Sequence, residues 1–258
     1  MANGWPASAS QRELLPRFRV LVGSWRPRAR SLVAAARLLL LFALLLGGCA
    51  IAVNSLVYFQ GDEIPPFVVE KLPLPLEGLW LGALKVHVAA ASFCLPACIL
   101  LQWKGLMRRA ARVHRWVGRI TGVVVLLALA PSGSYLALFA KGGLPGTLGF
   151  LVSGAITAVA MVQAIRSARA RRFTAHRRAA LHVLAQLSVA VTSRALLILL
   201  EATGLDPDPA YLIALWLPVL GSAAFVELTL LKRRNHEDQG DLRAVRTLGA
   251  DGVGGVRV

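Results

Sequence analysis

The chain has 258 residues, of which 56% are hydrophobic and only 16% are charged, and its mean hydropathy is +0.61. This composition is too apolar for a soluble domain of that length. The formal net charge of +16 comes from cations that recur at the ends of apolar stretches instead of forming one basic patch, which excludes a nucleic-acid-binding protein.

Six apolar stretches are long enough to cross a membrane. A spanning helix needs about 20 mostly apolar residues to cross roughly 30 Å of hydrocarbon. The sequence therefore predicts an all-α fold, a polytopic integral membrane bundle of six transmembrane helices. The predicted spans are approximately 37–59, 78–102, 113–140, 146–166, 177–200 and 210–231. Residues 37–231 form this domain, residues 1–36 form a basic cytoplasmic arm, and residues 232–258 form a polar, disordered cytoplasmic tail.

The distribution of charge predicts how the chain is oriented. Residues 1–37, 103–119, 166–178 and 232–258 together hold 25 of the 29 Lys and Arg residues, whereas the alternate loops are acidic. Loops rich in Lys and Arg face the cytoplasm, beside anionic inner-leaflet lipids. We therefore expect a multi-pass protein of the cell (cytoplasmic) membrane, with both termini in the cytoplasm.

Few ionisable side chains fall inside the predicted spans, and each is a candidate functional group because burying it in hydrocarbon is costly. They are Lys85, His87, His114, His176, His182, Arg194 and Glu227. His114 and His176 begin spans that both start at the cytoplasmic side, so their rings are expected at one level. His87 and Arg194 are expected together in the outer half of the bundle, at 1.5 Å of rise per residue. Glu227 is expected to pair with an Arg of a neighbouring loop.

Helical periodicity places some of these groups on shared faces. His176 and Arg194 are 18 residues apart, which is five whole turns, so they lie on one face of the fifth span. His182 points about 120° away from His176, and Gln186 lies on its side of the helix.

An ordered set of motifs runs through the middle of the chain. It consists of His87, His114-Arg115-x-x-Gly118-Arg119, Ser132-Gly133, His176-Arg177 and Arg194. With this set the chain resembles an uncharacterised family of predicted bacterial membrane proteins, known as domain of unknown function 2306, over roughly residues 80–200. Two places of the family pattern differ here, where the chain has Ala180 and His182. The resemblance implies a membrane protein and no particular reaction.

Three functional hypotheses remain open, and no catalytic residue is assigned, so the sequence does not decide whether the protein is an enzyme. In the first, His114 and His176 are axial ligands of the iron of haem b, since two imidazoles from facing helices can hold haem iron. His182 is a reserve ligand, Arg115 and Arg177 bind the propionates, and His87 with Arg194 contacts a quinone or a propionate. Such a protein would have an electron-transfer partner.

The second hypothesis is a non-catalytic protein that binds an anionic lipid or metabolite. The third and fifth spans both present N-termini to the cytoplasm, where free N–H groups and His-Arg pairs favour a phosphate or carboxylate. The third hypothesis is a scaffold or partner subunit, in which the His-Arg pairs only anchor the helices. The sequence does not indicate an oligomeric state.

Overall fold

The computed structural model describes residues 9–60 and 77–251, and side chains within residues 32–60, 77–103 and 105–230. In these residues the chain forms helices joined by short turns, and no strand occurs among them. The predicted all-α fold with six spans is confirmed. The segments long and apolar enough to cross a membrane are Leu32–Phe59, Glu77–Leu101, Ala111–Ala137, Gly143–Arg169, Phe173–Ala202 and Pro207–Leu230.

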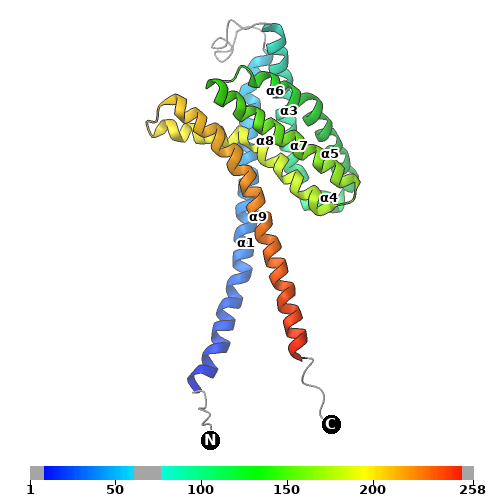
Figure 1. The fold of residues 1–258 in the computed structure, drawn as a ribbon, viewed down its shortest axis with the longest axis vertical. Coiled ribbons are helices and arrows are strands. Elements are labelled where there is room, and N and C mark those ends of the chain that lie inside the picture. Colours follow the sequence, from blue (N-terminus) through cyan, green and yellow to red (C-terminus); the bar gives the residue numbers. More distant parts are fainter. Residues whose placement is uncertain (1–8, 61–76, 252–258) are drawn as a thin grey trace. The chain divides into compact units, whose positions relative to one another are not determined.

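The helices follow one another in the order drawn in Figure 1. They are α1 (Ala9–Asn54), the 3₁₀ turn η1 (Ser55–Phe59), α3 (Glu77–Leu101), α4 (Lys104–Arg109), α5 (Ala111–Val124), the π-helical turn η2 (Val125–Leu129), α6 (Ala130–Ala137), α7 (Gly143–Arg169), α8 (Phe173–Ala202) and α9 (Pro207–Asp251). The contacts divide the chain into Met1–Leu46 and Gly47–Val258. All contacts discussed below lie within the second of these units.

Two helices extend beyond the spans that hydropathy predicts. The helix α1 begins at Ala9, inside the predicted basic arm, and α9 continues to Asp251, through most of the predicted disordered tail. Hydropathy detects only the apolar part of a helix, whereas residues such as Arg, Glu, Leu and Ala sustain helix in a polar segment as well. The division into an arm, a membrane domain and a tail stays a prediction.

The third span is one helical rod made of three segments. The helices α5 and α6 are joined through η2, where the backbone widens for one turn into a π-helix. Such π-helical turns are rare in proteins, and those that occur often lie at functional sites. Val125 at the start of η2 is fully buried, and Ser132 follows in the first turn of α6 and is also buried. One side of the irregular turn, with Val125 and Leu129, therefore faces the interior of the bundle.

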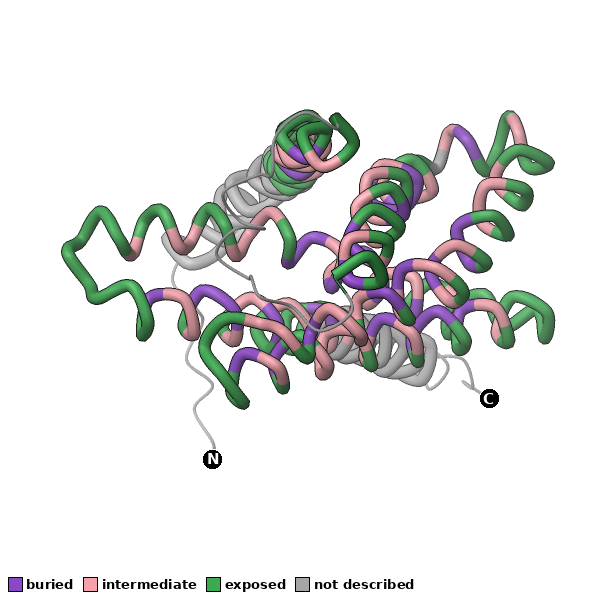
Figure 2. The backbone as a smooth tube through the Cα atoms, turned by 90° about the horizontal axis from the view of Figure 1, so that it is seen from above, coloured by how far each residue is buried: buried purple, intermediate pink, exposed green. Residues whose placement is uncertain are grey.

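The helix α8 is at the centre of the packing. It packs most extensively against α7 and α9 and also contacts α3, while α3 contacts α5, η2 and α6 (Figure 1). Along each helix, buried positions alternate with exposed ones (Figure 2). The exposed positions include large apolar side chains such as Leu127 and Phe173. Exposed apolar side chains in this number are expected where a bundle meets acyl chains instead of water.

Tight connections hold α7 between its neighbours. Gly142 and Gly143 have φ angles of 83° and 62°, which glycine adopts without a steric penalty, and they make the turn that leads into α7. At the other end of α7, Arg171 has a φ of 56° and lies in the short link to α8. This link makes α7 and α8 an antiparallel hairpin.

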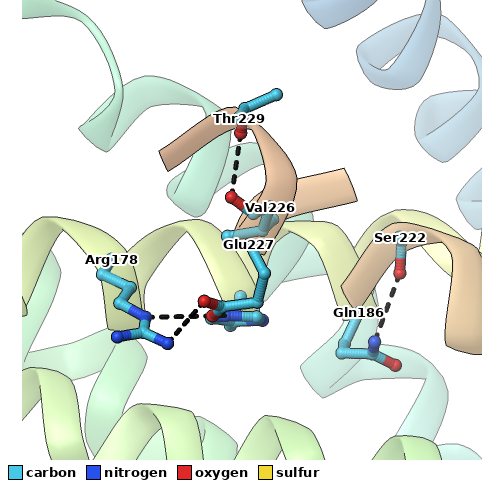
Figure 3. Close-up of polar contacts among 7 residues, drawn as sticks. Arg178, Gln186, Ser222, Val226, Glu227 and Thr229 are labelled. Atoms are coloured by element: carbon cyan, nitrogen blue, oxygen red, sulfur yellow. Dashed lines mark hydrogen bonds and ion pairs between the residues drawn. The ribbon is translucent and has the colours of Figure 1, made fainter. Parts of the chain in front are cut away.

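One buried polar side chain joins three helices. The side-chain oxygen of Gln186 in α8 accepts a hydrogen bond from Ser153 of α7 at 2.9 Å. Its amide nitrogen donates to the carbonyl of Val219 at 3.0 Å and to the hydroxyl of Ser222 at 3.2 Å, both in α9. The bond to Ser222 is drawn in Figure 3. Gln186 is only 3% exposed, so these bonds satisfy an amide that water does not reach. They fix the register of α8 against both neighbours.

Candidate functional site

The histidines that begin the third and fifth spans lie near each other. His114 is in the first turn of α5 and His176 in the first turn of α8, and their imidazoles are close enough to interact electrostatically. Sequence spacing predicts that the two rings lie at one level. In the described residues, α5 and α8 do not pack directly against each other, and α7 contacts both.

The two rings differ in what holds them. Nδ1 of His176 lies 2.9 Å from the carbonyl oxygen of Ala164 in α7, so in the neutral ring Nδ1–H donates to that oxygen and Nε2 carries the lone pair. This arrangement is the one that a ligating histidine usually has, with the far ring nitrogen tied to a backbone carbonyl. Nδ1 of His114 is buried and has no hydrogen-bond partner among the described residues. A bound group would supply the missing partner.

The arginines that follow these histidines are at the protein surface. Arg115 is exposed and lies within electrostatic range of His114, and Arg177 is exposed and already has an interaction partner. Both are next to the paired imidazoles in sequence, at the end of their helices where the bundle meets the polar phase.

A second cluster surrounds His87 of α3. Nδ1 of His87 lies 3.3 Å from Oγ of Ser132, and that hydroxyl donates to the carbonyl of Ala128 at 2.6 Å. Because the hydroxyl proton is used in this way, Ser132 accepts from Nδ1–H of His87, which leaves the lone pair on Nε2. A Cβ on Gly133 would lie only 2.9 Å from Cε1 of His87, so the ring needs a glycine beside it.

Arg194 of α8 belongs to the same part of the bundle. It lies within electrostatic range of His87, as predicted, and also of Tyr58 and Tyr211. Its Nη1 donates to the carbonyl of Ala190 in its own helix at 2.7 Å, and no carboxylate partner is found for it in the described part of the chain. Sequence alone does not bring the two tyrosines together with Arg194, because it does not show which helix ends are neighbours.

His182 lies with a carboxylate instead of with the other histidines. Its Nε2 is 2.5 Å from Oε1 of Glu227 in α9, and the same carboxylate accepts from Nε of Arg178 at 2.9 Å and from Nη2 of Arg178 (Figure 3). The expected pairing of Glu227 with an Arg is thereby confirmed, but the Arg belongs to the helix α8 and not to a loop. The use of His182 as a reserve ligand is not favoured by this geometry, because Glu227 already holds its Nε2.

Sequence reasoning missed the other members of this cluster. Gln163, Arg166 and Ser167 of α7 line a groove together with Arg178, His182 and Glu227. One signal in the sequence pointed to the α8–α9 part of this cluster. His182 and Gln186 are one turn apart, and both lie on the face of α8 that meets α9. Among the described residues no group of three or more His, Cys, Asp or Glu side chains could hold a metal ion.

The architecture and these intramembrane polar clusters define a polytopic α-helical membrane protein. The model of the family described as predicted membrane protein, domain of unknown function 2306, matches residues 84–230. The chain belongs to this family, as the motif set indicated. No curated protein and no solved structure matches the chain.

Proposed function

We propose that the protein is a membrane redox component that holds a b-type haem between His114 and His176. The observation that carries this proposal is that two imidazoles, on α5 and α8, lie within electrostatic range of each other, one of them oriented by the carbonyl of Ala164 and the other with an Nδ1 that has no hydrogen-bond partner among the described residues. Two histidines suffice for axial ligation, so the lack of a three-residue metal cluster in the described part does not conflict with it.

The chain's own residues would position the group. His176 presents Nε2 with its ring fixed by α7, and His114 lies within electrostatic range of it on α5. Arg115 and Arg177 lie at the helix ends, where propionates would reach the polar phase. A haem bound by two imidazoles supplies one-electron transfer.

The test is an absorption spectrum of the full-length protein purified from haem-supplemented cells. We expect a Soret band that sharpens on reduction with dithionite and that is lost in His114→Ala and His176→Ala. The control is His182→Gln, which keeps a nitrogen near Glu227 and should retain the band. Colourless wild-type protein, or a full Soret band in the double variant of His114 and His176, would refute the proposal.

A quinone head group is the second ligand that we propose, at Arg194 and His87. The specific support is a cation inside a span that donates to the carbonyl of Ala190 in its own helix and has no carboxylate partner in the described part of the chain, beside an imidazole whose Nε2 can accept a hydrogen bond. A quinone carbonyl would accept from Arg194, and the hydroxyl of the quinol would donate to His87.

The quinone site is tested by equilibrium binding of a short-chain quinone to the purified protein. Arg194→Leu and Gly133→Ala should weaken binding, the second because its new methyl group displaces the His87 ring. Gly82→Ala on α3 is the matched control, because a Cβ there meets nothing within 4 Å. If Arg194→Leu folds normally and binds the quinone with unchanged affinity, Arg194 does not bind the quinone and has a structural role only.

We further propose that the protein lies in the cytoplasmic membrane of a bacterium with both termini inside. The support is the Lys and Arg excess of alternate loops. In this orientation the His114–His176 pair and the groove beside Glu227 are near the cytoplasmic face, next to anionic lipid.

A further inference from the structure

A groove opens where α7, α8 and α9 meet, and it is separate from both histidine sites proposed above. Its volume is about 420 Å³. Polar lining comes from Gln163, Arg166, Ser167, Arg178, His182 and Glu227. The small side chains of Ala175 and Ala179 leave the space between these groups open.

The groove results from how the hairpin is built. The last turn of α7 carries Arg166, and the short link that contains Arg171 returns the chain at once into α8. The first turns of α8 therefore lie beside the basic end of α7. Arg178 and His182 are one turn apart on α8 and both face α9, where Glu227 lies three residues before Leu230, the end of the apolar span.

Glu227 is bonded to two residues of the groove but does not use all the N–H donors of Arg178. Its carboxylate takes two of the five N–H donors of Arg178 and one nitrogen of His182. Arg178 is 59% exposed, so its remaining donors are accessible to a ligand. Arg166 has no ion-pair partner in the described part of the chain. The groove therefore holds two guanidinium groups against one carboxylate, and an anion would balance this charge.

His182 lines the same groove and supports its geometry through Glu227. Nε2 of His182 is bonded to the carboxylate of Glu227, which also holds Arg178. Nδ1 of His182 is buried and exposes almost no surface. An anion in the groove would therefore be held by the guanidinium groups of Arg166 and Arg178 and not by His182.

We propose that this groove binds a phosphate group, and that the phosphate is the head group of an anionic membrane lipid. Arginine is well suited to phosphate, because its planar guanidinium donates in pairs. The groove lies toward the ends of the candidate spans of α7, α8 and α9, where a spanning helix meets the head-group region and lipid phosphates are expected. A soluble phosphate compound offers the same chemistry, so the experiment must separate the two sources.

Native mass spectrometry of the full-length protein tests the proposal, with phosphatidic acid, phosphatidylcholine and glycerol 3-phosphate as separate probes. We expect phosphatidic acid to be retained in preference to phosphatidylcholine. Arg166→Gln should weaken its binding about tenfold, the loss expected for one charge-assisted contact. Arg169→Gln is the control, because Arg169 lies in the same last turn of α7 but outside the groove lining.

A second variant separates binding from folding. His182→Gln keeps an amide nitrogen near the position of Nε2 and so keeps the contact with Glu227, and it should leave both lipid binding and the thermal midpoint little changed, whereas Arg166→Gln should weaken binding at an unchanged midpoint. Equal losses in Arg166→Gln and Arg169→Gln would mean general attraction to a basic surface and would overturn the proposal. Tighter binding of glycerol 3-phosphate than of phosphatidic acid would overturn the lipid as the source. None of these results depends on whether the protein binds haem.

Discussion

Glu227 shows how one ionised side chain is accommodated near the end of a span. Its carboxylate accepts from Arg178 and from His182, both on α8, so a single residue of α9 is bonded to two residues of its neighbour. A carboxylate this close to hydrocarbon is expected to be paired. The pair is partly exposed, with side-chain exposures of 59% for Arg178 and 34% for Glu227, which limits its contribution to stability.

Replacing Glu227 with Gln should destabilise the protein by about 1 kcal/mol, because the charge is lost while an amide of the same shape remains. The measurement is the thermal unfolding midpoint in detergent, which should fall by a few degrees. Glu201→Gln is the control, since that carboxylate is exposed and has no hydrogen-bond partner in the described region. A midpoint that falls equally in both variants would contradict the structural role of Glu227.

At the scale of elements, the closeness of α7 and α9 depends on a glycine. A Cβ at Gly149 would lie 2.6 Å from Cδ2 and 2.9 Å from Cγ of Leu215, well inside the normal contact distance. Small residues at such positions let membrane helices approach closely. Five residues further along α7, a Cβ at Gly154 would meet nothing within 4 Å.

Gly149→Ala should therefore cost about 1 kcal/mol of stability, because Leu215 must shift out of its packed position. Gly154→Ala should leave stability unchanged or raise it slightly, since alanine favours helix. The two variants differ by the same methyl group on the same helix, and their thermal midpoints can be compared directly. If Gly154→Ala proves the more destabilising, the described packing of α7 on α9 is wrong.

Sequence predicts the elements better than their internal details. Apolar length gave the six spans, because the thickness of the bilayer fixes how long each must be. The π-helical turn at Val125–Leu129 was not predicted, since nothing in that run of apolar residues marks one extra residue in a turn. The groove was missed because Arg166 and His182 come close only through packing, on which hydropathy says nothing.

At the scale of the whole molecule, orientation is the property on which the proposed sites depend. The His114–His176 pair and the phosphate groove are at the same side of the bundle as the Arg-rich link between α7 and α8. The excess of cations in alternate loops predicts that this side faces the cytoplasm.

Reporter fusions test that orientation. Alkaline phosphatase, which is active only outside the cytoplasm, should be inactive when fused after Arg171 and active when fused after Gly204, between α8 and α9. A fluorescent protein that folds only in the cytoplasm should give the opposite result at the same two positions. Activity of the phosphatase after Arg171 would reverse the assigned topology and would move both sites to the exterior.

The bond between Ser153 and Gln186 has a consequence for how the protein is made. When a helix leaves the translocon, a Gln side chain without a hydrogen-bond partner is unfavourable among acyl chains. The hydroxyl that bonds Gln186 belongs to Ser153, in the helix synthesised just before α8. The short link at Arg171 lets the two helices pair as soon as both have emerged. The hairpin therefore carries the partner for its own polar side chain into the bilayer, and α9 arrives later to complete the set.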